Sequence, residues 1–597
     1  MDTIAIVDFG GQYTHLIANR IRRLGVYSEI IQPDADMGLY RNFKGIILSG
    51  SPYSVLDKES PKIDKDMLSF SIPILGLCYG HQLITQLLGG KLSQGKTREY
   101  GLAELIITVE NPLLKGLSPS QQIWMSHGDS VEVLPDGFTC YGVTSDCPSA
   151  AIGNESKHIY GLQFHPEVTD TPNGMKILEN FITICECKRM WNSQEYLKNI
   201  ETSIKQQCKD KKVFLFVSGG VDSTVAFSIL NNALGVQNVL GLHIDNGLMR
   251  YKESDEILRT MKKNGYNNLH VYDASSLFLD SLKNIYDPEK KRAIIGKQFV
   301  NVKKLALDNL GLKEDEWVLA QGTIYPDTIE SAGTKHADKI KTHHNRVESI
   351  LELLEKGLVI EPLAMLYKDE VRQLGEYLEI SKELLMRHPF PGPGLGVRIL
   401  CSNGSEVSPD TALCDVVEKY AEKEGYSSYI LPLKSVGVQG DSRTYAHPAL
   451  LAGTQDWKKL EFLSTEITNS VKGVNRILFG LNVGTDPEYR LVKSYITRDR
   501  IEKLQHIDYY VTTALMESGE YNSVWQMPVV LLPLLNKRGD ECVVLRPIAS
   551  QEAMTARFVP LMDETLNKIV AKAQTIDGIG DVFFDITHKP PGTIEWE

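Results

Sequence analysis

A short strand–glycine–helix passage near the middle of the chain sets the strongest constraint on how this sequence can fold. An apolar run, residues 213–217, leads into a Ser-Gly-Gly-Val-Asp-Ser-Thr turn, and an amphipathic run, residues 225–230, follows it. Such an apolar run is typical of a buried parallel strand, and paired glycines let backbone N–H groups converge on one point. Because the next helix directs its positive end there, the turn predicts a phosphate site. Its members are Ser218, Gly219, Gly220, Val221, Asp222, Ser223 and Thr224.

This turn differs from the Walker loop, because the G-x-x-x-x-G-K-[ST] spacing and its lysine are missing. Without a lysine that reaches the terminal phosphates, the turn is suited to hold a pyrophosphate that leaves as a unit. The residues S-G-G-V-D-S resemble the loop of the N-type ATP pyrophosphatases, which adenylate a substrate oxygen. The resemblance implies that ATP binds here.

Length and composition narrow the class of protein. A chain of 597 residues can hold several domains, and its net charge of −12 gives no basic surface for nucleic acid. No apolar run reaches membrane-spanning length. The nine cysteines contain no C-x-x-C pair, which argues against a structural metal site. An odd cysteine count without a signal peptide indicates a reducing compartment, so we expect a cytosolic protein.

The first third of the chain predicts a parallel α/β sheet, because strand-like runs at 4–7, 45–48 and 72–77 alternate with helical patterns such as 13–24. The third run ends in G-L-C-Y-G, followed by a helix over 81–88. This is a nucleophile elbow with Cys78 in place of serine, and the helix N-terminus behind it favours the thiolate. His165, in Q-F-H-P-E, is the predicted base, and Glu167 the residue that orients it.

An oxyanion at this elbow requires two backbone donors. The N–H of Tyr79 follows the nucleophile, and the turn at Gly50 can supply the second. The alternatives are that Cys78 is an ordinary buried hydrophobic residue and that His165 is structural. The two flanking glycines and the H-P-E sequence favour catalysis.

Five segments resemble the class I glutamine amidotransferases and follow that family's order: D-F-G-G-Q-Y, S-G-S-P-Y-S-V, G-L-C-Y-G-H-Q, W-M-S-H-G-D and F-H-P-E-V. One departure is Ser51, where the family usually has glycine. The resemblance implies that Cys78 attacks the glutamine amide and that ammonia is released. It also implies that the glutamine is held by Gln82, Ser126, His127 and Gly128.

The middle third begins after a polar stretch, residues 186–211, whose period predicts a helix between two domains. A strand over 239–244 ends at Asp245, which should line the ligand crevice of a doubly wound sheet and bind ATP. A strand over 317–321 leads to Asp327, our predicted Mg²⁺ ligand. Asp222 is the second candidate, with helix capping as an equal alternative. Lys341 could reach the ATP phosphates.

The last third predicts an α+β domain with a duplication. The Pro-Gly run at 388–396 indicates a rigid boundary. Beyond it, residues 431–479 and 527–584 share a pattern of strands, helix and strand, for which we expect antiparallel sheets with helices on one face. The closing K-P-P-G-T-I-E-W-E could be a frayed end, but its residues predict an ordered lid over a polar substrate.

The whole chain resembles the glutamine-hydrolysing GMP synthetases. The segments that carry this resemblance are S-G-G-V-D-S-T, H-P-F-P-G-P-G-L-G, V-G-V-Q-G-D-S-R-T-Y and K-P-P-G-T-I-E-W-E. It implies ATP-dependent amination of XMP to GMP through an adenyl-XMP intermediate, with AMP and pyrophosphate as products and Mg²⁺ as cofactor. The implied XMP contacts are Arg292, Asp441, Gln526, Lys589 and Glu595.

The same resemblance implies an amidotransferase domain over 1–190, an ATP pyrophosphatase domain over 191–398 and an XMP-binding, dimerisation-type domain over 399–597. The last is longer than in compact bacterial enzymes by about residues 446–523, so a monomer and a homodimer both stay open. Two other functions were weighed. A glutamine-dependent NAD synthetase is disfavoured by the G-x-C-x-G and H-P-E sequences, and a silent scaffold by the intact motifs.

Overall fold

The computed structural model describes the chain except for residues 311–315, 333–358, 406–408, 440–441, 485–486 and 551–555. The chain divides into two compact units. The first unit comprises Met1–Thr202, Thr323–Val347 and Leu363–Tyr377, and the second Ser203–Gly322, Glu348–Pro362 and Leu378–Glu597. The domain boundaries expected near residues 190 and 398 stay predictions.

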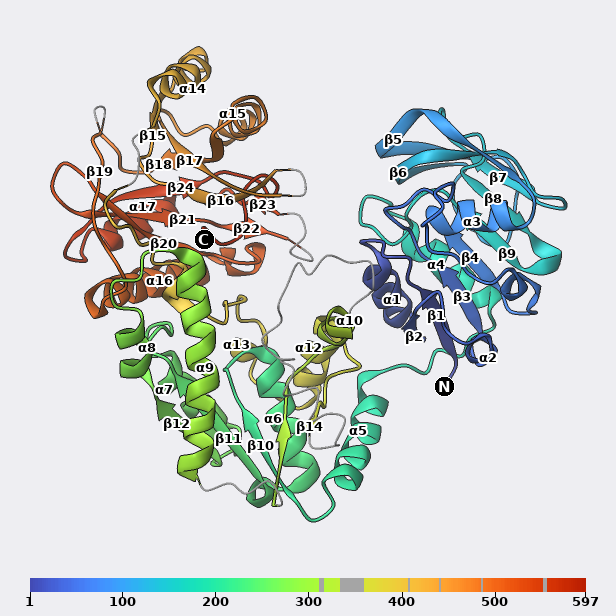
Figure 1. Ribbon diagram of the computed structural model, residues 1–597, viewed down its shortest axis with the longest axis horizontal. Coiled ribbons are helices and arrows are strands. Elements are labelled where there is room, and N and C mark those ends of the chain that lie inside the picture. The colour runs from blue at the N-terminus through green and yellow to red at the C-terminus, as the bar shows by residue number, and fades with distance from the viewer. Residues whose placement is uncertain (311–315, 333–358, 406–408, 440–441, 485–486, 551–555) are drawn as a thin grey trace. The chain divides into compact units, whose positions relative to one another are not determined.

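The first unit is built on a nine-stranded sheet in the order β2-β1-β3-β4-β9-β8-β7-β5-β6 (Figure 1). The strands from β2 to β9 in that order are parallel, as predicted, and the rest are antiparallel. The strands are β1 (Thr3–Val7), β2 (Tyr27–Ile31), β3 (Gly45–Leu48), β4 (Ile74–Leu77), β5 (Lys91–Ile107), β6 (Ser120–Val133), β7 (Thr139–Val143), β8 (Ala151–Asn154) and β9 (Ile159–Leu162). The helices are α1 (Thr14–Arg23), α2 (Met37–Tyr40), α3 (Tyr79–Leu87), α4 (Gly174–Ile184), α10 (Tyr325–Ala332) and α12 (Lys368–Tyr377), while α5 (Ser193–Cys208) continues into the second unit.

An arginine enclosed by aromatic rings explains why two later segments belong to the first unit. The guanidinium carbon of Arg22, near the end of α1, lies 4.6, 4.5 and 5.0 Å from the ring centroids of Tyr27, Tyr325 and Tyr367. Its Nη1 pairs with Glu370 at 3.3 Å. A cation over several ring faces is attractive, and more so when it is desolvated. Sequence spacing gave no sign of this contact.

The second unit contains two larger sheets and a two-stranded one. The five-stranded sheet, in the order β12-β11-β10-β13-β14, is parallel throughout, as predicted. The eight-stranded sheet runs β15-β17-β18-β24-β21-β20-β19, with β16 paired to β17.

The strands of this unit are β10 (Lys212–Phe216), β11 (Val239–Asp245), β12 (Leu269–Asp273), β13 (Trp317–Ala320), β14 (Val359–Ile360), β15 (Ser427–Ile430), β16 (Ser435–Gln439), β17 (Ser442–Ala452), β18 (Val474–Gly480), β19 (Arg490–Leu491), β20 (Val529–Leu535), β21 (Glu541–Leu545), β22 (Ile548–Ala549), β23 (Arg557–Phe558) and β24 (Ile579–Asp585). The helices are α6 (Val221–Leu234), α7 (Glu253–Lys263), α8 (Ser275–Ser281), α9 (Pro288–Leu310), α13 (Lys382–Leu385), α14 (Thr411–Lys423), α15 (Trp457–Ser470), α16 (Arg498–Ser518) and α17 (Asp563–Ala573).

The predicted duplication is visible in the strand order, although the first strand of the first copy, β15, ends just before residue 431, where that copy was expected to begin. Strands β15, β17 and β18 form an antiparallel pair, then a parallel return through α15; β20, β21 and β24 repeat this pattern through α17. The two copies meet where β18 and β24 pair antiparallel, with Phe479 opposite Phe584. Each phenylalanine is the sixth residue of its seven-residue strand, so the register is symmetric about this pair. The expectation of antiparallel sheets was wrong for two pairings, β17–β18 and β21–β24, because each helix is long enough to return the chain in parallel.

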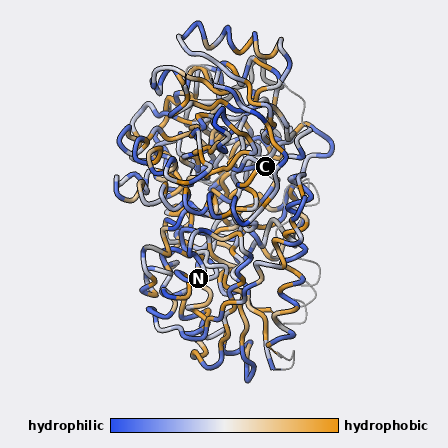
Figure 2. The backbone as a smooth tube through the Cα atoms, turned by 90° about the vertical axis from the view of Figure 1, so that its left-hand side faces the viewer, coloured by the Kyte–Doolittle hydropathy of each residue, from blue (hydrophilic) through white to orange (hydrophobic). Residues whose placement is uncertain are grey.

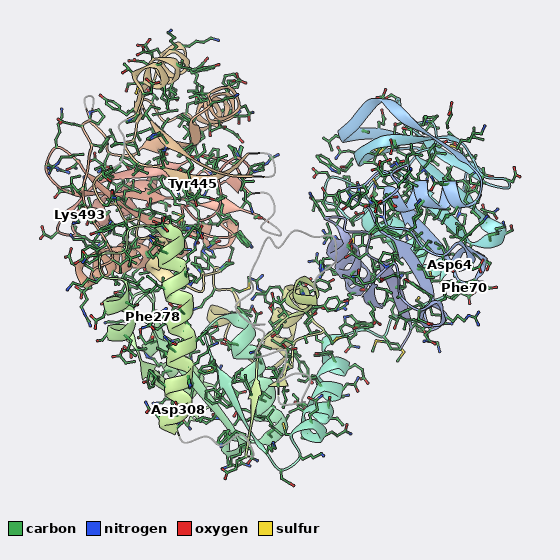
Figure 3. All side chains as sticks on the ribbon, viewed as in Figure 1. Asp64, Phe70, Phe278, Asp308, Tyr445 and Lys493 are labelled. Carbon is green, nitrogen blue, oxygen red and sulfur yellow. The ribbon has the colours of Figure 1, made fainter. Side chains whose placement is uncertain are left out.

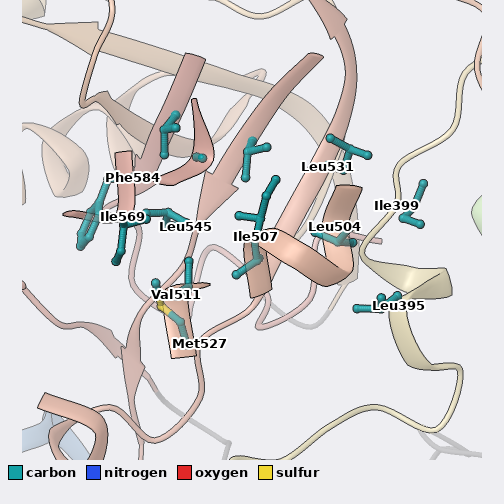
Figure 4. Close-up of a cluster of buried hydrophobic side chains, with 14 of the residues drawn as sticks. Leu395, Ile399, Leu504, Ile507, Val511, Met527, Leu531, Leu545, Ile569 and Phe584 are labelled. Carbon is teal, nitrogen blue, oxygen red and sulfur yellow. The ribbon is translucent and has the colours of Figure 1, made fainter. Parts of the chain in front are cut away.

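Helices cover one face of the eight-stranded sheet, as predicted. Phe584 of β24 packs in the main hydrophobic cluster with Leu504 of α16 and Ile569 of α17 (Figure 4). Phe479 of β18 belongs to the same cluster. Leu395, from the Pro-Gly run, lies in the same cluster. Figure 2 colours the backbone by hydropathy and shows hydrophobic and hydrophilic stretches alternating along the chain. Among the helices that the structure describes, none combines the length and apolar character needed to cross a membrane.

Helix α9 connects the two larger sheets of the second unit. Its Ile295 and Val302 belong to the main cluster, while Ala306 packs with Phe214 and Leu242 of the five-stranded sheet. Phe278 of α8, labelled in Figure 3, packs edge-on against Phe299 of α9 with 4.8 Å between centroids. One helix therefore shares its buried face between both sheets.

The opposite face of the eight-stranded sheet is covered by the end of the chain rather than by a helix. Trp596 is fully buried there, and its Nε1 donates to Asp585 Oδ2 at 3.0 Å. Arg476 and Arg546 each approach the same oxygen to 2.9 Å. Burial by itself raises the pKa of Asp585, but the two guanidiniums outweigh it and hold that pKa below its usual value. The expectation that Trp596 belongs to a lid was therefore wrong, since its ring is part of the core.

We predict that Asp585→Asn lowers the free energy of unfolding by about 3–5 kcal/mol, because it leaves two buried guanidiniums without their carboxylate. Denaturant titration followed by tryptophan fluorescence measures the change. The exposed Asp577→Asn on the same unit is the matched control. Equal effects of the two substitutions would show that the buried cluster contributes nothing specific.

Candidate active sites

The cysteine turn of the first unit has the geometry of a nucleophile elbow. Cys78 lies between β4 and α3 with φ 50° and ψ −101°, a backbone conformation that is unfavourable for a residue with a Cβ. A Cβ on Gly76 would lie 2.5 Å from the carbonyl oxygen of Gly80, and one on Gly80 would lie 2.4 Å from that of Leu48. Both flanking glycines are therefore required by close backbone approach. The helix begins at Tyr79, two residues earlier than predicted.

His165 and Glu167 form a buried pair next to this elbow. His165 Nδ1 lies 2.7 Å from Glu167 Oε1, and the two residues are 5% and 1% exposed. Burial lowers the pKa of His165, but the charge of Glu167 and hydrogen bonds to Cys78 and Glu167 outweigh it and raise the pKa to about 10. The imidazole is therefore protonated at neutral pH and can supply a proton to a leaving group.

Three residues that sequence reasoning missed hold this pair in place. The ring of Tyr13 packs edge-on against His165 with 4.9 Å between centroids. Arg20 Nε donates to the Glu167 carbonyl at 3.0 Å, and Thr171 Oγ1 donates to the His165 carbonyl at 2.7 Å. Tyr13 could have been found from the sequence, because it is the last residue of the D-F-G-G-Q-Y segment. No sequence motif marks Arg20 or Thr171.

The residues expected to hold glutamine and its oxyanion surround the same point. A Cβ on Gly50 would lie 3.3 Å from His165 Cε1 and 4.0 Å from Cys78 Cβ, so this turn adjoins both. Cys78 Sγ donates to the carbonyl of Ser126 on β6 at 3.4 Å. Tyr79 starts α3, where the first backbone N–H groups have no partner within the helix.

The other expected glutamine contacts form a hydrogen-bonded group around Asp129. Gln82 Nε2 donates to the Asp129 carbonyl at 2.8 Å and to Gln163 Oε1 at 3.1 Å. His127 Nδ1 lies 3.0 Å from the same carbonyl, and Gly128 stands between the two residues in β6. Gln82 thus ties the elbow helix to β6.

The phosphate loop of the second unit follows β10 and opens α6, as predicted. The hydroxyl oxygens of Ser218 and Ser223 lie 3.0 Å apart, and Gly220 N donates to Ser218 Oγ at 3.3 Å. Gly219 has φ +83°, and a Cβ there would lie 2.1 Å from Cδ1 of Ile257 on α7. A side chain is therefore excluded at Gly219. Gly220 is the N-cap of α6, with Val221 as the first helical residue and Thr224 N bonded back to the Gly220 carbonyl.

Carboxylates lie on three elements near strand ends. Asp222 is in the first turn of α6, where the helix dipole favours negative charge, but it is not the N-cap residue. Asp245 ends β11 and accepts from Gly247 N at 2.9 Å and Ser254 Oγ at 2.7 Å. Asp327, in the first turn of α10, accepts from Ile324 N at 3.3 Å and belongs to the first unit. Lys341 lies outside the described residues.

Two of the residues implied for XMP binding meet at the end of the chain. Gln526 Nε2 donates to Glu595 Oε1 at 3.3 Å. Arg398 donates to both carboxylate oxygens of Glu595, at 3.1 and 3.2 Å. Arg292 Nη1 pairs with Glu289 at 3.1 Å, and Lys589 exchanges backbone hydrogen bonds with Ala556. Asp441 lies outside the described residues.

A buried lysine that sequence reasoning passed over anchors the same tail. Lys291, fully buried on α9, pairs with Glu597 and donates to the Ile399 carbonyl at 2.9 Å. The sequence shows only that Lys291 stands in a basic cluster at residues 290–292, and basic clusters usually face solvent. Arg398 had no signal beyond following the Pro-Gly run.

We predict that Glu167→Gln lowers the pKa of His165 below the value of about 10 in the unchanged protein. The substitution keeps the size of the side chain and removes the charge that stabilises the imidazolium. A pH titration by NMR of histidine-labelled protein should show that the His165 imidazolium of the unchanged protein persists through neutral pH. In the variant it should lose its proton at a lower pH. Glu179→Gln, at a surface ion pair, is the control. An unchanged His165 titration in Glu167→Gln would contradict the pairing.

Comparison with known families assigns three parts of the chain. Residues 5–185 match "Glutamine amidotransferase class-I", residues 193–294 match "NAD synthase" and residues 513–596 match "GMP synthase C terminal domain". These matches support the class I amidotransferase, ATP pyrophosphatase and α+β parts of the predicted fold.

Curated relatives match over the full length. A "Probable GMP synthase" (glutamine-hydrolyzing) from Leptospira interrogans (strain Fiocruz L1-130) is 45% identical and covers 100% of this chain and 99% of its own. A protein of that name from Caenorhabditis elegans is 36% identical, covering 100% and 92%. A shorter "GMP synthase" from Caldanaerobacter subterraneus is 43% identical over 80% of this chain and 97% of its own. The chain therefore belongs to the glutamine-hydrolysing GMP synthase family and is an enzyme of that family.

Proposed function

We propose that the chain is a carbon–nitrogen ligase that aminates XMP to GMP in the cytosol, as a step of guanine nucleotide synthesis. Ammonia comes from glutamine, and ATP activates the acceptor through an adenyl-XMP intermediate. The observation that carries the proposal is the placement in one unit of the phosphate loop and the Gln526–Glu595–Arg398 group. A nucleotide-adenylating site needs both a pyrophosphate clamp and a second polar site for the acceptor.

In the first half-reaction, the Cys78 thiolate attacks the glutamine amide carbon. The protonated His165 gives its proton to the departing ammonia, which leaves a thioester on Cys78. Water then hydrolyses that thioester to glutamate, with His165 as the base. Backbone N–H groups at Tyr79 and Gly50 stabilise the oxyanion, a contribution worth several kcal/mol per donor in related sites, about 2.7–4.

In the second half-reaction, the C2 oxygen of XMP attacks the α-phosphorus of ATP, and pyrophosphate leaves as a unit. Negative charge develops on the departing pyrophosphate. The hydroxyl groups of Ser218 and Ser223 and the N–H groups of the loop stabilise it by hydrogen bonding. Ammonia then attacks C2 and AMP departs, which gives GMP. Gln526 and Glu595 offer an amide and a carboxylate to the purine, while Arg292 and Lys589 offer positive charge to its phosphate.

The carboxylates fit Mg²⁺, which takes one or two carboxylates together with substrate phosphates. Asp222, in the first turn after the phosphate loop, would hold it together with the substrate phosphates. Asp327, the other predicted ligand, belongs to the first unit and stays a separate prediction. Bound there, Mg²⁺ would neutralise negative charge on the phosphate oxygens.

We predict that Cys78→Ala abolishes glutamine-dependent GMP formation and leaves the ammonium-dependent reaction in place, since free ammonia needs no thioester. The assay supplies XMP, ATP and Mg²⁺ with either glutamine or ammonium and measures GMP, AMP and pyrophosphate. Loss of both activities would mean that Cys78 is structural. Absence of AMP and pyrophosphate with the unchanged protein would overturn the adenylation route.

The matched substitution on the other half-reaction is Ser223→Ala. It removes a phosphate-loop hydroxyl and should abolish amination with either nitrogen source. Glutamine hydrolysis at Cys78 does not use this hydroxyl and should stay possible in the variant, so together the two variants separate the half-reactions.

We further infer that the subunit needs no second copy to complete its eight-stranded sheet. An unpaired strand edge invites pairing with another chain, and β18 occupies the edge of β24 from within the same chain. About a fifth of this chain has no counterpart in the Caldanaerobacter subterraneus relative, which agrees with an added copy of the repeated unit.

We therefore predict a monomer in sedimentation velocity at low protein concentration, with and without XMP and ATP. A tight dimer under both conditions would contradict the inference. Dimerisation only at high concentration would be compatible with the inference, because β18 would still pair with β24 within one chain.

A further inference from the structure

A buried histidine that no step of the proposed reaction uses lies between the phosphate loop and Asp245. His243 is 1% exposed, on β11. Its Nδ1 lies 2.8 Å from the carbonyl oxygen of Val217, the residue that precedes the loop. Its Nε2 lies 3.0 Å from Ser254 Oγ, and Ser254 in turn donates to Asp245 Oδ2 at 2.7 Å. One chain of hydrogen bonds thus joins the ends of two neighbouring strands, β10 and β11.

The hydrogen atoms available to this series of hydrogen bonds can be counted. A carbonyl oxygen only accepts, so Nδ1 must donate to Val217. The remaining two contacts need one hydrogen between Nε2 and Ser254 and another between Ser254 and Asp245. A neutral imidazole, a hydroxyl and a carboxylate together bring two hydrogens, whereas the three contacts need three. One additional proton, taken from solvent, would satisfy all three contacts.

Helix α7 places the hydrogen bonds of His243, Ser254 and Asp245 next to the phosphate loop. Ser254 is in the first turn of α7, and Ile257, on the same helix, closes against Gly219 of the loop. Asp245 is also fixed by Gly247 N at 2.9 Å. The helix that supplies the bridging hydroxyl therefore also shapes the loop.

We propose that His243, acting through Ser254, is a positioning residue that shares one proton with Asp245. That proton sits as an imidazolium facing a carboxylate, or shifts through the hydroxyl to give a neutral pair. Either form removes the net negative charge of Asp245 from a strand end that must accept a polyanionic nucleoside triphosphate. The inference rests on the proposed binding of ATP at this edge of the sheet, and it assigns His243 and Ser254 a role in ATP affinity.

The test uses the full-length protein in the ammonium-dependent reaction, so that the glutaminase does not limit the rate. Ser254→Ala breaks the chain of hydrogen bonds and should raise the KM for ATP about tenfold, equivalent to about 1.4 kcal/mol, with a smaller change in kcat. Ser254→Thr keeps the hydroxyl and should restore the KM. Thr260→Ala removes an exposed hydroxyl from the same helix and should change nothing.

The protonation state has its own readout. In ¹⁵N-histidine-labelled protein at pH 7, His243 is assigned by the signal that disappears in His243→Phe. It should carry protons on both nitrogens or, if the proton has shifted, on Nδ1 with a strongly bonded Nε2; Ser254→Ala should change this pattern.

A KM unaltered by Ser254→Ala, an equal effect of Thr260→Ala, or failure of Ser254→Thr to restore the KM would overturn the proposal. A His243 signal that Ser254→Ala does not alter would also overturn it. Failure of the proposed function is distinguishable, since the unchanged protein would then form no GMP from ammonium while the histidine spectrum could still be recorded.

Discussion

The carboxylate of Asp585 fixes the part of the fold on which the predicted acceptor site depends. It projects from β24 into a fully buried region and holds two guanidiniums and an indole N–H. The guanidiniums use their other N–H groups on carbonyls of the tail, from Arg476 to Thr593 and from Arg546 to Ile594. Removing water from charges is costly unless every charge is paired. The tail is consequently held in one path, and that path puts Glu595 beside Arg398.

Local patterns were enough to predict the strand–turn–helix passages. The turns at Cys78 and Ser218 need glycine at fixed places, and the flanking runs have the composition of buried strands, so each element followed from its own residues. The antiparallel expectation for the last third failed because strand direction depends on where a helix returns the chain. The sequence patterns could not predict that Thr323–Val347 belongs to the first unit. That placement depends on aromatic rings around Arg22 that are remote from it in sequence.

The candidate sites divide in the same way. Cys78, His165 and Glu167 stand out because each belongs to a short motif with a chemical reason for its spacing. Arg20 acts on that pair from α1, more than a hundred residues away in sequence, and it looks like an ordinary helix residue. Tyr13, just before α1, lies in the D-F-G-G-Q-Y segment, but that segment does not show that its ring packs on His165. Lys291 was hidden because a basic cluster usually faces water, whereas here its ammonium group is buried against Glu597 and the Ile399 carbonyl.

The symmetric pairing of β18 with β24 has a consequence for how this domain can vary. In a sheet shared by two identical chains, every substitution appears twice, once on each side of the axis. Here the two halves are separate stretches of one chain, so each position can change alone. The position equivalent to Asp585 in the first copy is Gly480, and that equivalent to Arg476 in the second is Asp581. The backbone arrangement is repeated in the two copies, but these charged residues are not. The arginines around Asp585 therefore bind the C-terminal tail of the same chain on one side of the repeat only.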